Sequence, residues 1–582
     1  MYDKFRILSL CIAAIPVIWM FLRLSRSDRS TLSPSVTLKN SAMLKLYELL
    51  SKYCLIILAL IFMVFLFSRL FHLSSIPAGI HLDEIGVTYD AFSLKNFGTD
   101  RAGAAYPVYP SNYGDGNSAL YTYLEMLLLY FLPFSLITVR LPAVIIAIPC
   151  FFASFGIVYE LYEDRVFSLL GPVFVTITPY FFTSERFGLD CNLMLSVSTV
   201  ALYFLIKATK ESRGLFYFLA GIVFGITLYT YILSYLMLPV FYLLMVIYLL
   251  FIRKIKIREL SAFVIPFGLL GIPLFLEQLV NMGILPEFHF FLSDFQKLPD
   301  YRIGEISIKN IPGNLSLIIK LLFGGDSLGF NALYEFGPLY WCCIPVIILG
   351  FISALKKIKL SFKDHEVYPI SIIMFFGLSI YSVALLLTGF NTYNSNAIYI
   401  VFIMLAIEGI DYTVKARVSG SIRLFVLVSA FAMLFVSFIL FSEFYFRRQT
   451  AVYGFHAVFV STEPGDIVKY ADNNYNPAND KTIYTEINYS ERDYADLLIA
   501  LYTETDPAEW RRYEAQKQES PEDAMLNNIA FHFPEEFDED EDAIYILGTD
   551  WNHISSYLKD TGFDEDTGFP GYTILYRTAP IR

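Results

Sequence analysis

The sequence is poor in charge and lacks the motifs of several common soluble enzymes. Only 17% of its 582 residues are charged, against about 25% in an average soluble domain. It contains no GxxxxGKS/T phosphate-binding loop, no GxGxxG sequence and no HExxH zinc-binding helix. These absences argue against a nucleotide-binding enzyme of the Walker or Rossmann type and against a zinc protease.

Cysteine is also scarce, and none of it lies in the polar C-terminal part. The six cysteines all fall in or beside apolar runs: Cys11, Cys54, Cys150, Cys191, Cys342 and Cys343. Because no CxxC pair occurs, the sequence predicts neither a disulfide framework nor a zinc site of that type. The 54 Phe and 41 Tyr are not accompanied by a basic patch, which argues against a nucleic-acid partner.

Apolar segments of bilayer length are abundant. Hydrophobic residues make up 56% of the chain, and a helix needs about 20 apolar residues in succession to cross a membrane. Twelve such segments predict about twelve transmembrane helices, the first of them an N-terminal anchor: 7–23, 52–71, 140–161, 166–183, 189–207, 214–231, 233–252, 258–280, 339–355, 368–389, 397–413 and 421–443.

The short loops between these segments predict which ends face the cytoplasm. Lys and Arg gather in RLSRSDRS, KATKESR, RKIKIR, KKIKLSFK and KARVSGSIR, and such loops stay on the cytoplasmic side. Residues 72–139, 184–188, 281–338 and 390–396 then fall outside. An even number of crossings must separate the first two of these loops, so the apolar run 118–137 is predicted to lie in the interface instead of spanning the membrane.

The chain ends in a polar, acidic region. Residues 444–582 hold 27 acidic and 11 basic side chains. KTIYTEI, DAIYILGT and YTILYR have strand character, YADLLIALYT and HISSYLKDTG have helical character, and FPEEFDEDEDA is typical of a solvated loop. We therefore predict an N-terminal anchor and linker (1–48), a membrane catalytic domain (49–443) and an extracytoplasmic α/β domain (444–582).

Two adjacent carboxylates, Asp83 and Glu84, follow a predicted span in the stretch GIHLDEIGVTYD. Charges beside the hydrocarbon are costly and are usually kept for function. Neighbouring residues on a helix point about 100° apart, so one carboxylate can act as a general base while the other holds a partner. An alternative is that this segment only caps the following helix, with Asp83 accepting from the first amides.

More polar residues are predicted on the same outer face. The turn YFFTSERFGLDCN holds Arg186 and Asp190. Arginine suits a phosphate group, although an interfacial arginine can also snorkel toward lipid headgroups. Other candidates are Arg140, Tyr229, Tyr231, Tyr235, Lys297, Arg302 and the segment FNTYNSN at 390–396. Their convergence on one face predicts a polar pocket there.

Four motifs resemble those of the GT-C membrane glycosyltransferases. They are, in chain order, PAGIHLDEIGVTYDAFSLKNFGTDRAG, YGDGNSALYTYLEMLLLYF, VRLPAVIIAI and TPYFFTSERFGLDCNLML. The sequence is similar to bacterial relatives of protein O-mannosyltransferases and of the aminoarabinose transferase that modifies lipid A, over about residues 50–410. The resemblance implies an all-α polytopic membrane fold with interfacial helices in a long first outer loop, here followed by a small C-terminal α/β domain.

The resemblance also implies roles for particular residues. Asp83 takes the place of the catalytic base and Glu84 that of its partner, while Arg186 and Asp190 belong to the second outer loop that helps to form the pocket. Relatives often carry an arginine in the turn where this sequence has Asn394 and Asn396. The remaining candidates are Tyr231, Lys297, Arg302 and Asn396 for the donor phosphate or pocket, and Asp115 and Arg140 for support of the loop.

The activity implied is inverting transfer of a sugar from a polyprenyl-phosphate donor to an acceptor hydroxyl, outside a bacterial plasma membrane. Asp83 would take the hydroxyl proton, and Arg186, or else Arg302 or Lys297, would face the departing phosphate. The acceptor is a glycan, a lipid or a protein. The resemblance does not fix a cofactor: one branch of the superfamily uses a divalent metal, and Mg²⁺ or Mn²⁺ would then be held by Asp83 and Glu84.

Two other classes of function fit a chain with many apolar spans. One is a transporter or flippase of a lipid-linked or polymeric substrate, and the other is a non-catalytic protein of the same fold. Transporters place charges in mid-span within repeated halves, whereas here the charges lie in outer loops. Release of polyprenyl phosphate from a lipid-linked sugar distinguishes the enzyme from both alternatives.

Overall fold

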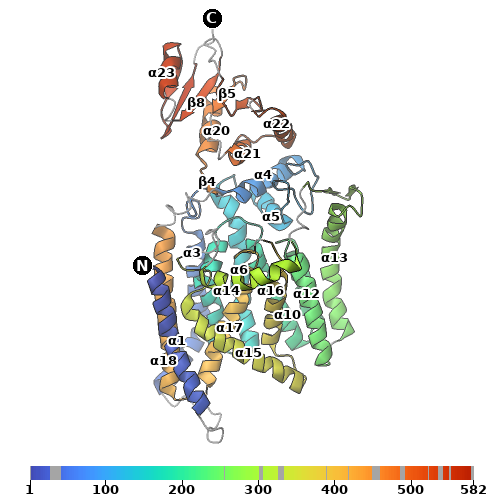
Figure 1. Cartoon of the computed structure of the whole chain (residues 1–582), viewed down its shortest axis with the longest axis vertical. Coiled ribbons are helices and arrows are strands. Elements are labelled where there is room, and N and C mark those ends of the chain that lie inside the picture. Colours follow the sequence, from blue (N-terminus) through green and yellow to red (C-terminus); the bar gives the residue numbers. More distant parts are fainter. Residues whose placement is uncertain are drawn as a thin grey trace.

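The structure is a computed structural model that shows a helical body with a small sheet domain at one end (Figure 1). It describes residues 2–26, 41–254, 256–299, 306–324, 333, 335–388, 390–416, 418–447, 459–485, 492–521, 523–534, 542–548 and 552–577. The predicted fold class, a polytopic helical membrane protein with a C-terminal α/β domain, is confirmed.

Every predicted span contains helix in the structure. Among the described residues, seven helices are long and apolar enough to cross a membrane, and shorter apolar helices supplement them. The helices are α1 (Tyr2–Arg26), α3 (Cys54–Leu70), α6 (Leu136–Tyr162), α7 (Arg165–Ser168), α8 (Leu170–Ile177), α9 (Pro179–Ser184), α10 (Asn192–Glu211), α11 (Gly214–Thr227), α12 (Ser234–Phe251), α13 (Ile257–Asn281), α15 (Ile344–Asp364), α16 (Pro369–Ala384), α17 (Ile398–Lys415) and α18 (Gly420–Arg447).

The short helix α2 (Ser41–Lys52) precedes α3. The first outer loop follows α3 and carries two helices, α4 (Leu82–Phe97) and α5 (Ala119–Leu129). With 11 residues, α5 is about 16 Å long, too short for a hydrocarbon core of about 30 Å. It lies beside α4 at the end of the body nearest the sheet domain (Figure 1). The structure therefore agrees with the prediction that 118–137 does not span.

The third predicted outer loop contains structure that the sequence analysis did not assign. Strands β2 (Phe288–Phe290) and β3 (Ser293–Phe295) form a hairpin, and the 3-10 helix η2 (Ile308–Asn310) leads into α14 (Ile311–Gly324). Helix α14 lies across the upright helices instead of along them (Figure 1). A second short 3-10 helix, η3 (Trp341–Cys343), precedes α15.

The C-terminal domain is built around a six-stranded sheet of order β6-β7-β5-β8-β10-β9. Its predicted elements are present: β5 (Ile483–Thr485), β8 (Ile544–Gly548), β10 (Tyr572–Tyr576), α21 (Arg492–Tyr502) and α23 (Asn552–Asp560). Elements that were not predicted are α20 (Glu463–Tyr475), α22 (Pro507–Glu519), β6 (Met525–Leu526), β7 (Ile529–Ala530) and β9 (Asp564–Asp566). Most of the acidic run FPEEFDEDEDA lies outside the described residues.

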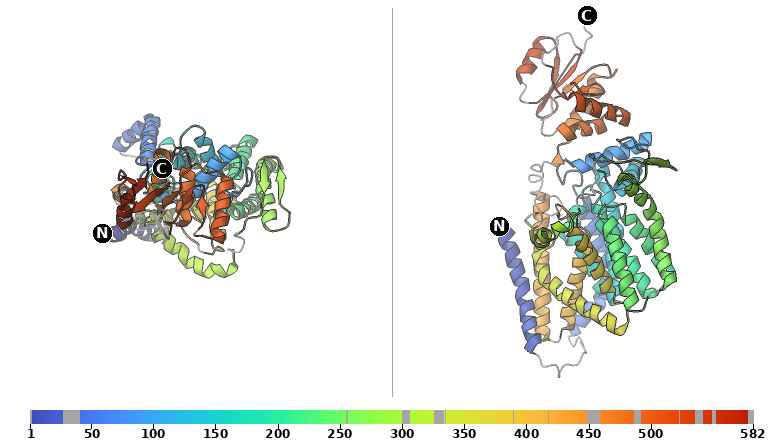
Figure 2. Two further views of the ribbon diagram at one scale, coloured as in Figure 1. Left: turned by 90° about the horizontal axis from the view of Figure 1, so that it is seen from above. Right: turned by 45° about the vertical axis from the view of Figure 1, so that its right-hand side comes forward.

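The C-terminal domain rests on the first outer loop (Figure 2). Strand β1 (Ile80–His81), just before α4, pairs antiparallel with β4 (Phe459–Val460). The Tyr89 hydroxyl of α4 donates to the carbonyl of Thr505 at 2.9 Å. One apolar cluster joins Ile80 and Tyr89 to the core of the sheet domain. The segment that carries the two adjacent carboxylates therefore contacts the C-terminal domain both just before α4, through β1, and within α4, through Tyr89.

Candidate active site

Helix α4 begins with a capping box made by His81 and Glu84. The Nδ1 atom of His81 accepts a hydrogen bond from the backbone N–H of Asp83 at 3.0 Å, and the Glu84 carboxylate accepts from the backbone N–H of His81 at 2.9 Å. This reciprocal pair satisfies amides that a helix start leaves free. The predicted cap exists, but its side chains are His81 and Glu84, so the expectation that Asp83 forms the cap is wrong.

Glu84 is completely buried and both of its carboxylate oxygens are occupied. Oε1 accepts from Nε of Arg140 at 3.1 Å and from the backbone N–H of Gly188 at 2.7 Å, while Oε2 accepts from His81. Burial raises the pKa of Glu84, but the Arg140 guanidinium and the two backbone donors outweigh it and hold the pKa below its usual value. Glu84 thus ties α4 to the second outer loop.

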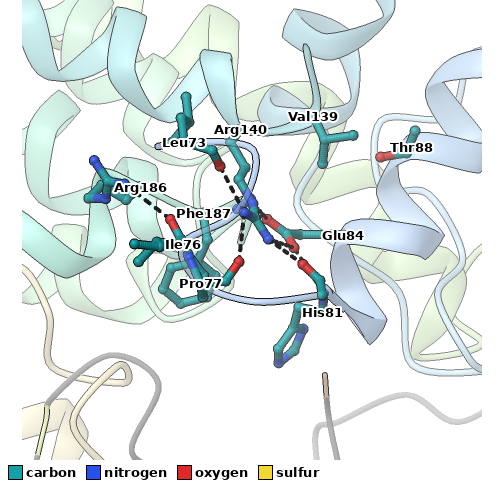
Figure 3. Close-up of polar contacts among 12 residues, drawn as sticks. Leu73, Ile76, Pro77, His81, Glu84, Thr88, Val139, Arg140, Arg186 and Phe187 are labelled. Atoms are coloured by element: carbon teal, nitrogen blue, oxygen red, sulfur yellow. Dashed lines mark hydrogen bonds and ion pairs between the residues drawn. The ribbon is translucent and has the colours of Figure 1, made fainter. Parts of the chain in front are cut away.

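Arg140 completes this buried junction (Figure 3). Besides the ion pair with Glu84, its guanidinium donates to the carbonyls of Leu73 at 2.9 Å, Pro77 at 3.0 Å and Gly79 at 2.6 Å. The carbonyls belong to the unwound segment between α3 and α4, which has no helix to satisfy them. The contacts of Arg140 are those of a residue that supports the loop.

Arg186 makes similar contacts with the last turn of α3 and the start of this segment (Figure 3). Its side chain is buried. Nε donates to the Tyr445 hydroxyl, and the two terminal nitrogens donate to the carbonyls of Ser68, Arg69, Phe71 and Ile76. All five N–H groups of the guanidinium therefore have acceptors. In this structure Arg186 has no donor left for a phosphate, which corrects its predicted place as the first phosphate ligand.

Asp83 differs from its neighbour because its carboxylate is open to solvent. The side chain is 39% exposed. Oδ1 accepts from Nδ2 of Asn112 at 3.1 Å, and Oδ2 lies 3.6 Å from Nδ1 of His81. Asn112 is itself held by Arg101, which pairs with the buried Asp90 at 3.1 Å. The carboxylate is thus oriented by one amide while remaining accessible.

Asp190 brings the second outer loop to the same region. Its carboxylate accepts from the backbone N–H groups of Ser118 at 3.0 Å and Cys191 at 2.6 Å, so it joins the second loop to the start of α5. Burial raises the pKa of Asp190 to about 6, and the charge of Asp83 adds to the shift.

The turn at 390–396 also joins this region. Nδ2 of Asn394 donates to the Tyr231 hydroxyl at 2.7 Å, and Nδ2 of Asn396 donates to the carbonyl of Cys191. Cys191 directly follows Asp190. Hydrogen bonds thus link the first loop to the second loop, the second loop to this turn, and this turn to the segment between α11 and α12.

The remaining predicted residues are placed less centrally. The backbone N–H of Asp115 donates to the carbonyl of Asn112 at 3.1 Å, so Asp115 belongs to the turn that holds Asn112. Lys297 is exposed, and its neighbour Leu298 packs at Gly116 of the first loop. Arg302 lies outside the described residues. The Tyr229 hydroxyl is turned away, toward the carbonyl of Leu270 at 2.8 Å.

Asn112 and Arg101 belong to the site but are not marked as such in the sequence. They lie in the predicted loop, but no local pattern marks an asparagine that contacts a carboxylate 29 positions earlier. The capping role of His81 could have been recognised, because a polar residue three positions before a glutamate at a helix start is the capping-box spacing.

Asp83 and Glu84, the residues predicted to hold a metal if one takes part, are not arranged to bind one together. Among the described residues, no three His, Cys, Asp or Glu side chains gather closely enough to hold an ion. Glu84 in particular keeps both oxygens in contacts with Arg140 and with backbone amides. The arrangement therefore does not fit a metal shared by Asp83 and Glu84.

The overall fold is similar to that of solved structures of ArnT. Among solved structures, the chain is similar to ArnT from Cupriavidus metallidurans bound to undecaprenyl phosphate, with a TM-score of 0.51 and 11% identity, over 93% of this chain and 99% of that chain. ArnT from the same organism in the apo state matches with a TM-score of 0.51 and 10% identity, over 90% and 97% of the two chains. At these identities the similarity is one of fold.

A weaker match is the oligosaccharyltransferase of Archaeoglobus fulgidus in complex with Zn and sulfate. Its TM-score is 0.46 at 11% identity, over 89% of this chain and 72% of that chain. No family model matches the sequence, and no curated protein sequence matches it.

Proposed function

We propose that this protein is an inverting glycosyltransferase that moves a sugar from a polyprenyl-phosphate donor to an acceptor hydroxyl, with Asp83 as the general base. The observation that carries the proposal is the contrast at the start of α4. His81 and Glu84 cap the helix, which leaves the 39% exposed Asp83 carboxylate free for a different task. The crystallised complex of ArnT with undecaprenyl phosphate supports a polyprenyl-phosphate partner.

In the proposed reaction the acceptor oxygen attacks the anomeric carbon of the donor sugar. Its proton passes to a carboxylate oxygen of Asp83 as the new glycosidic bond forms. The bond between the anomeric carbon and the phosphate oxygen breaks, and its electron pair leaves with the polyprenyl phosphate. Attack from the face opposite the departing phosphate inverts the anomeric centre. Asn112, through its bond to Oδ1 of Asp83, would hold the base at a fixed angle to the acceptor.

The departing phosphate needs a positive charge, and Lys297 is our proposal for it. The guanidinium of Arg186 is filled by carbonyls, whereas Lys297 is exposed beside the first loop. A flexible ammonium is suited to follow the phosphate as it leaves. The Tyr231 and Asn394 pair and the buried Asn396 would line the sugar side of the pocket.

We further propose that the face carrying Asp83 and the C-terminal domain is extracytoplasmic, in a bacterial plasma membrane. The charge pattern of the loops supports this, because the basic loops belong to the opposite ends of the helices. The domain limits at residues 48 and 443 belong to the same proposal. Glu84 would act as a positioning residue that fixes α4, and a divalent metal, if one takes part, would need other ligands.

The test is release of polyprenyl phosphate by membranes that contain the protein. A set of radiolabelled polyprenyl-phosphate sugars is incubated with these membranes and with membranes from cells carrying the empty vector. We expect release of polyprenyl phosphate from at least one donor, and a product of inverted anomeric configuration by NMR. Movement of intact donor across the membrane without release would instead identify a flippase, and retention of configuration would exclude direct displacement.

A further inference from the structure

A cavity opens between α11, α12 and α13 at the end of the membrane body remote from the C-terminal domain. Its volume is about 200 Å³. The wall is almost entirely apolar and aromatic: Leu205, Tyr217, Tyr242, Met245, Val246, Leu249, Leu260, Phe263, Val264 and Phe267. One of these residues, Val264, is also exposed at the outer surface of the bundle, with a relative accessibility of 48%. The cavity therefore communicates with the region where lipid chains lie.

Helices α11 and α13 touch closely beside the cavity. A Cβ atom on Gly221 would lie 2.3 Å from the carbonyl oxygen of Phe263, and one on Gly225 would lie 2.6 Å from the Leu270 side chain. Gly221 lets α11 pack against the backbone of α13, and Gly225 makes room for the Leu270 side chain. One turn before Gly221, the ring of Tyr217 lines the cavity.

The mouth of the cavity is positively charged. Lys254 and Lys256 line it together with one acid, Glu259. Glu259 accepts from Nζ of Lys256 at 3.0 Å, which leaves the ammonium of Lys254 without an ion-pair partner among the described residues. Arg253 and Arg258 flank the same short connection. The connection thus carries four cations against one carboxylate.

One polar group lies unsatisfied inside the apolar wall. The hydroxyl of Tyr242 is buried and has no hydrogen-bond partner within the described part of the chain. The Tyr242 ring is fixed by Phe263 and Phe267, with ring centres 4.7 Å away in each case. Leaving a buried hydroxyl unpaired costs about 1–3 kcal/mol, so an occupant that brings an acceptor oxygen would be favoured over a pure hydrocarbon.

We propose that this cavity binds an acidic phospholipid of the adjacent leaflet. An acyl chain fills the apolar space, an ester carbonyl accepts from Tyr242, and the phosphate lies against Lys254 and Lys256. Basic pockets at the membrane boundary favour anionic headgroups in this way. The site is at the opposite face from Asp83 and does not depend on the proposed transfer reaction.

The test is native mass spectrometry of the purified full-length protein with phosphatidylglycerol or phosphatidylcholine of identical chains. We expect wild type to bind phosphatidylglycerol about tenfold more tightly. Lys254→Glu should reduce that preference to less than about twofold, whereas Lys363→Glu, an exposed lysine on another helix at the same face, should keep it. Val246→Trp, which fills the cavity, should weaken both lipids.

Three outcomes would overturn the proposal. Equal binding of the two lipids to wild type would remove the role of the charged mouth. Saturation of the site by inorganic phosphate alone would identify a free anion as the ligand. A protein dimer that is lost in Val246→Trp, in place of lipid adducts, would mean that a second copy of the chain fills the cavity.

Discussion

The two ends of the membrane body each bury a glutamate, Glu84 or Glu408. Comparing them distinguishes a carboxylate that stabilises the fold from one that can take part in a reaction. At the end near the C-terminal domain, Glu84 is held by Arg140 and two backbone amides. At the other end, Glu408 accepts from Tyr162 at 2.6 Å, Ser353 at 2.6 Å and Lys357 at 2.8 Å. Both carboxylates are fully satisfied, as buried charges must be.

The difference lies in what stands next to each glutamate. Beside Glu84 the chain places Asp83, a carboxylate that is 39% exposed and oriented by a single amide. No comparable open carboxylate adjoins Glu408 among the described residues, where Asp411 pairs with Lys415 at 2.8 Å. Glu84 and Glu408, whose oxygens are all hydrogen-bonded, stabilise the fold. Of these three carboxylates, only the exposed one of Asp83 is available to take a proton. The account predicts that the two ends respond differently to substitution.

The largest effect is expected for Arg140→Met. The change leaves Glu84 charged and buried without its partner, and breaking such a pair costs about 3–5 kcal/mol. We expect little folded protein by size-exclusion chromatography, and a large loss of unfolding free energy in mixed micelles. The double variant Arg140→Met with Glu84→Gln should recover part of the lost unfolding free energy, because no buried charge then lacks a partner. An unfolding free energy equal to wild type in the single variant would show that the junction is not structural.

A smaller effect is expected at the opposite end for Glu408→Gln. The amide oxygen can still accept from one of the two hydroxyls, Ser353 or Tyr162, and the amide NH2 group can donate to the other. Lys357, with 26% of its side chain exposed, can turn toward water. We expect a loss of about 1–3 kcal/mol of stability and an unchanged transfer rate per folded molecule. If the rate fell as steeply as it does on loss of Asp83, the proposed separation between the two ends would be wrong.

Asn112→Ala tests whether the orientation of the exposed Asp83 carboxylate matters for transfer. Loss of the amide frees Asp83 to rotate without removing its charge, so kcat should fall about tenfold, which corresponds to about 1.4 kcal/mol, while KM stays the same. The measurement is steady-state transfer in lipid nanodiscs. Asn474→Ala, an exposed asparagine of the C-terminal domain, is the matched control. A change in KM alone would indicate that Asn112 contacts substrate instead of orienting the base.

The smallest effect is expected for Tyr89→Phe. This change removes only the hydrogen bond to the carbonyl of Thr505 and keeps the ring contact with Trp510. We expect a loss of about 1 kcal/mol of stability and a transfer rate within about twofold of wild type. Release of the C-terminal domain to limited proteolysis in this variant would mean that the hydroxyl contributes more than the apolar cluster.

The sequence was sufficient for features that repeat along the chain. Bilayer-length apolar runs located the spans, and the basic loops implied that 118–137 does not span. Short runs of β-branched, aliphatic and aromatic residues, such as Tyr572–Tyr576, located strands. It was insufficient where a side chain meets a distant backbone. Nothing near Arg186 in the sequence shows that the carbonyls of residues 68–76 will be unsatisfied. For the same reason the pairing of β1 with β4 could not be foreseen.

The most direct test of the central claim is the turnover of Asp83→Asn. The variant is purified in lipid nanodiscs beside Asp364→Asn, the same chemical change at an exposed position on the opposite face. Removing a general base costs about 10²–10⁴-fold in rate, so we expect that loss in Asp83→Asn, with wild-type unfolding behaviour and donor affinity, and no loss in the control. Near wild-type turnover by folded Asp83→Asn would contradict the account.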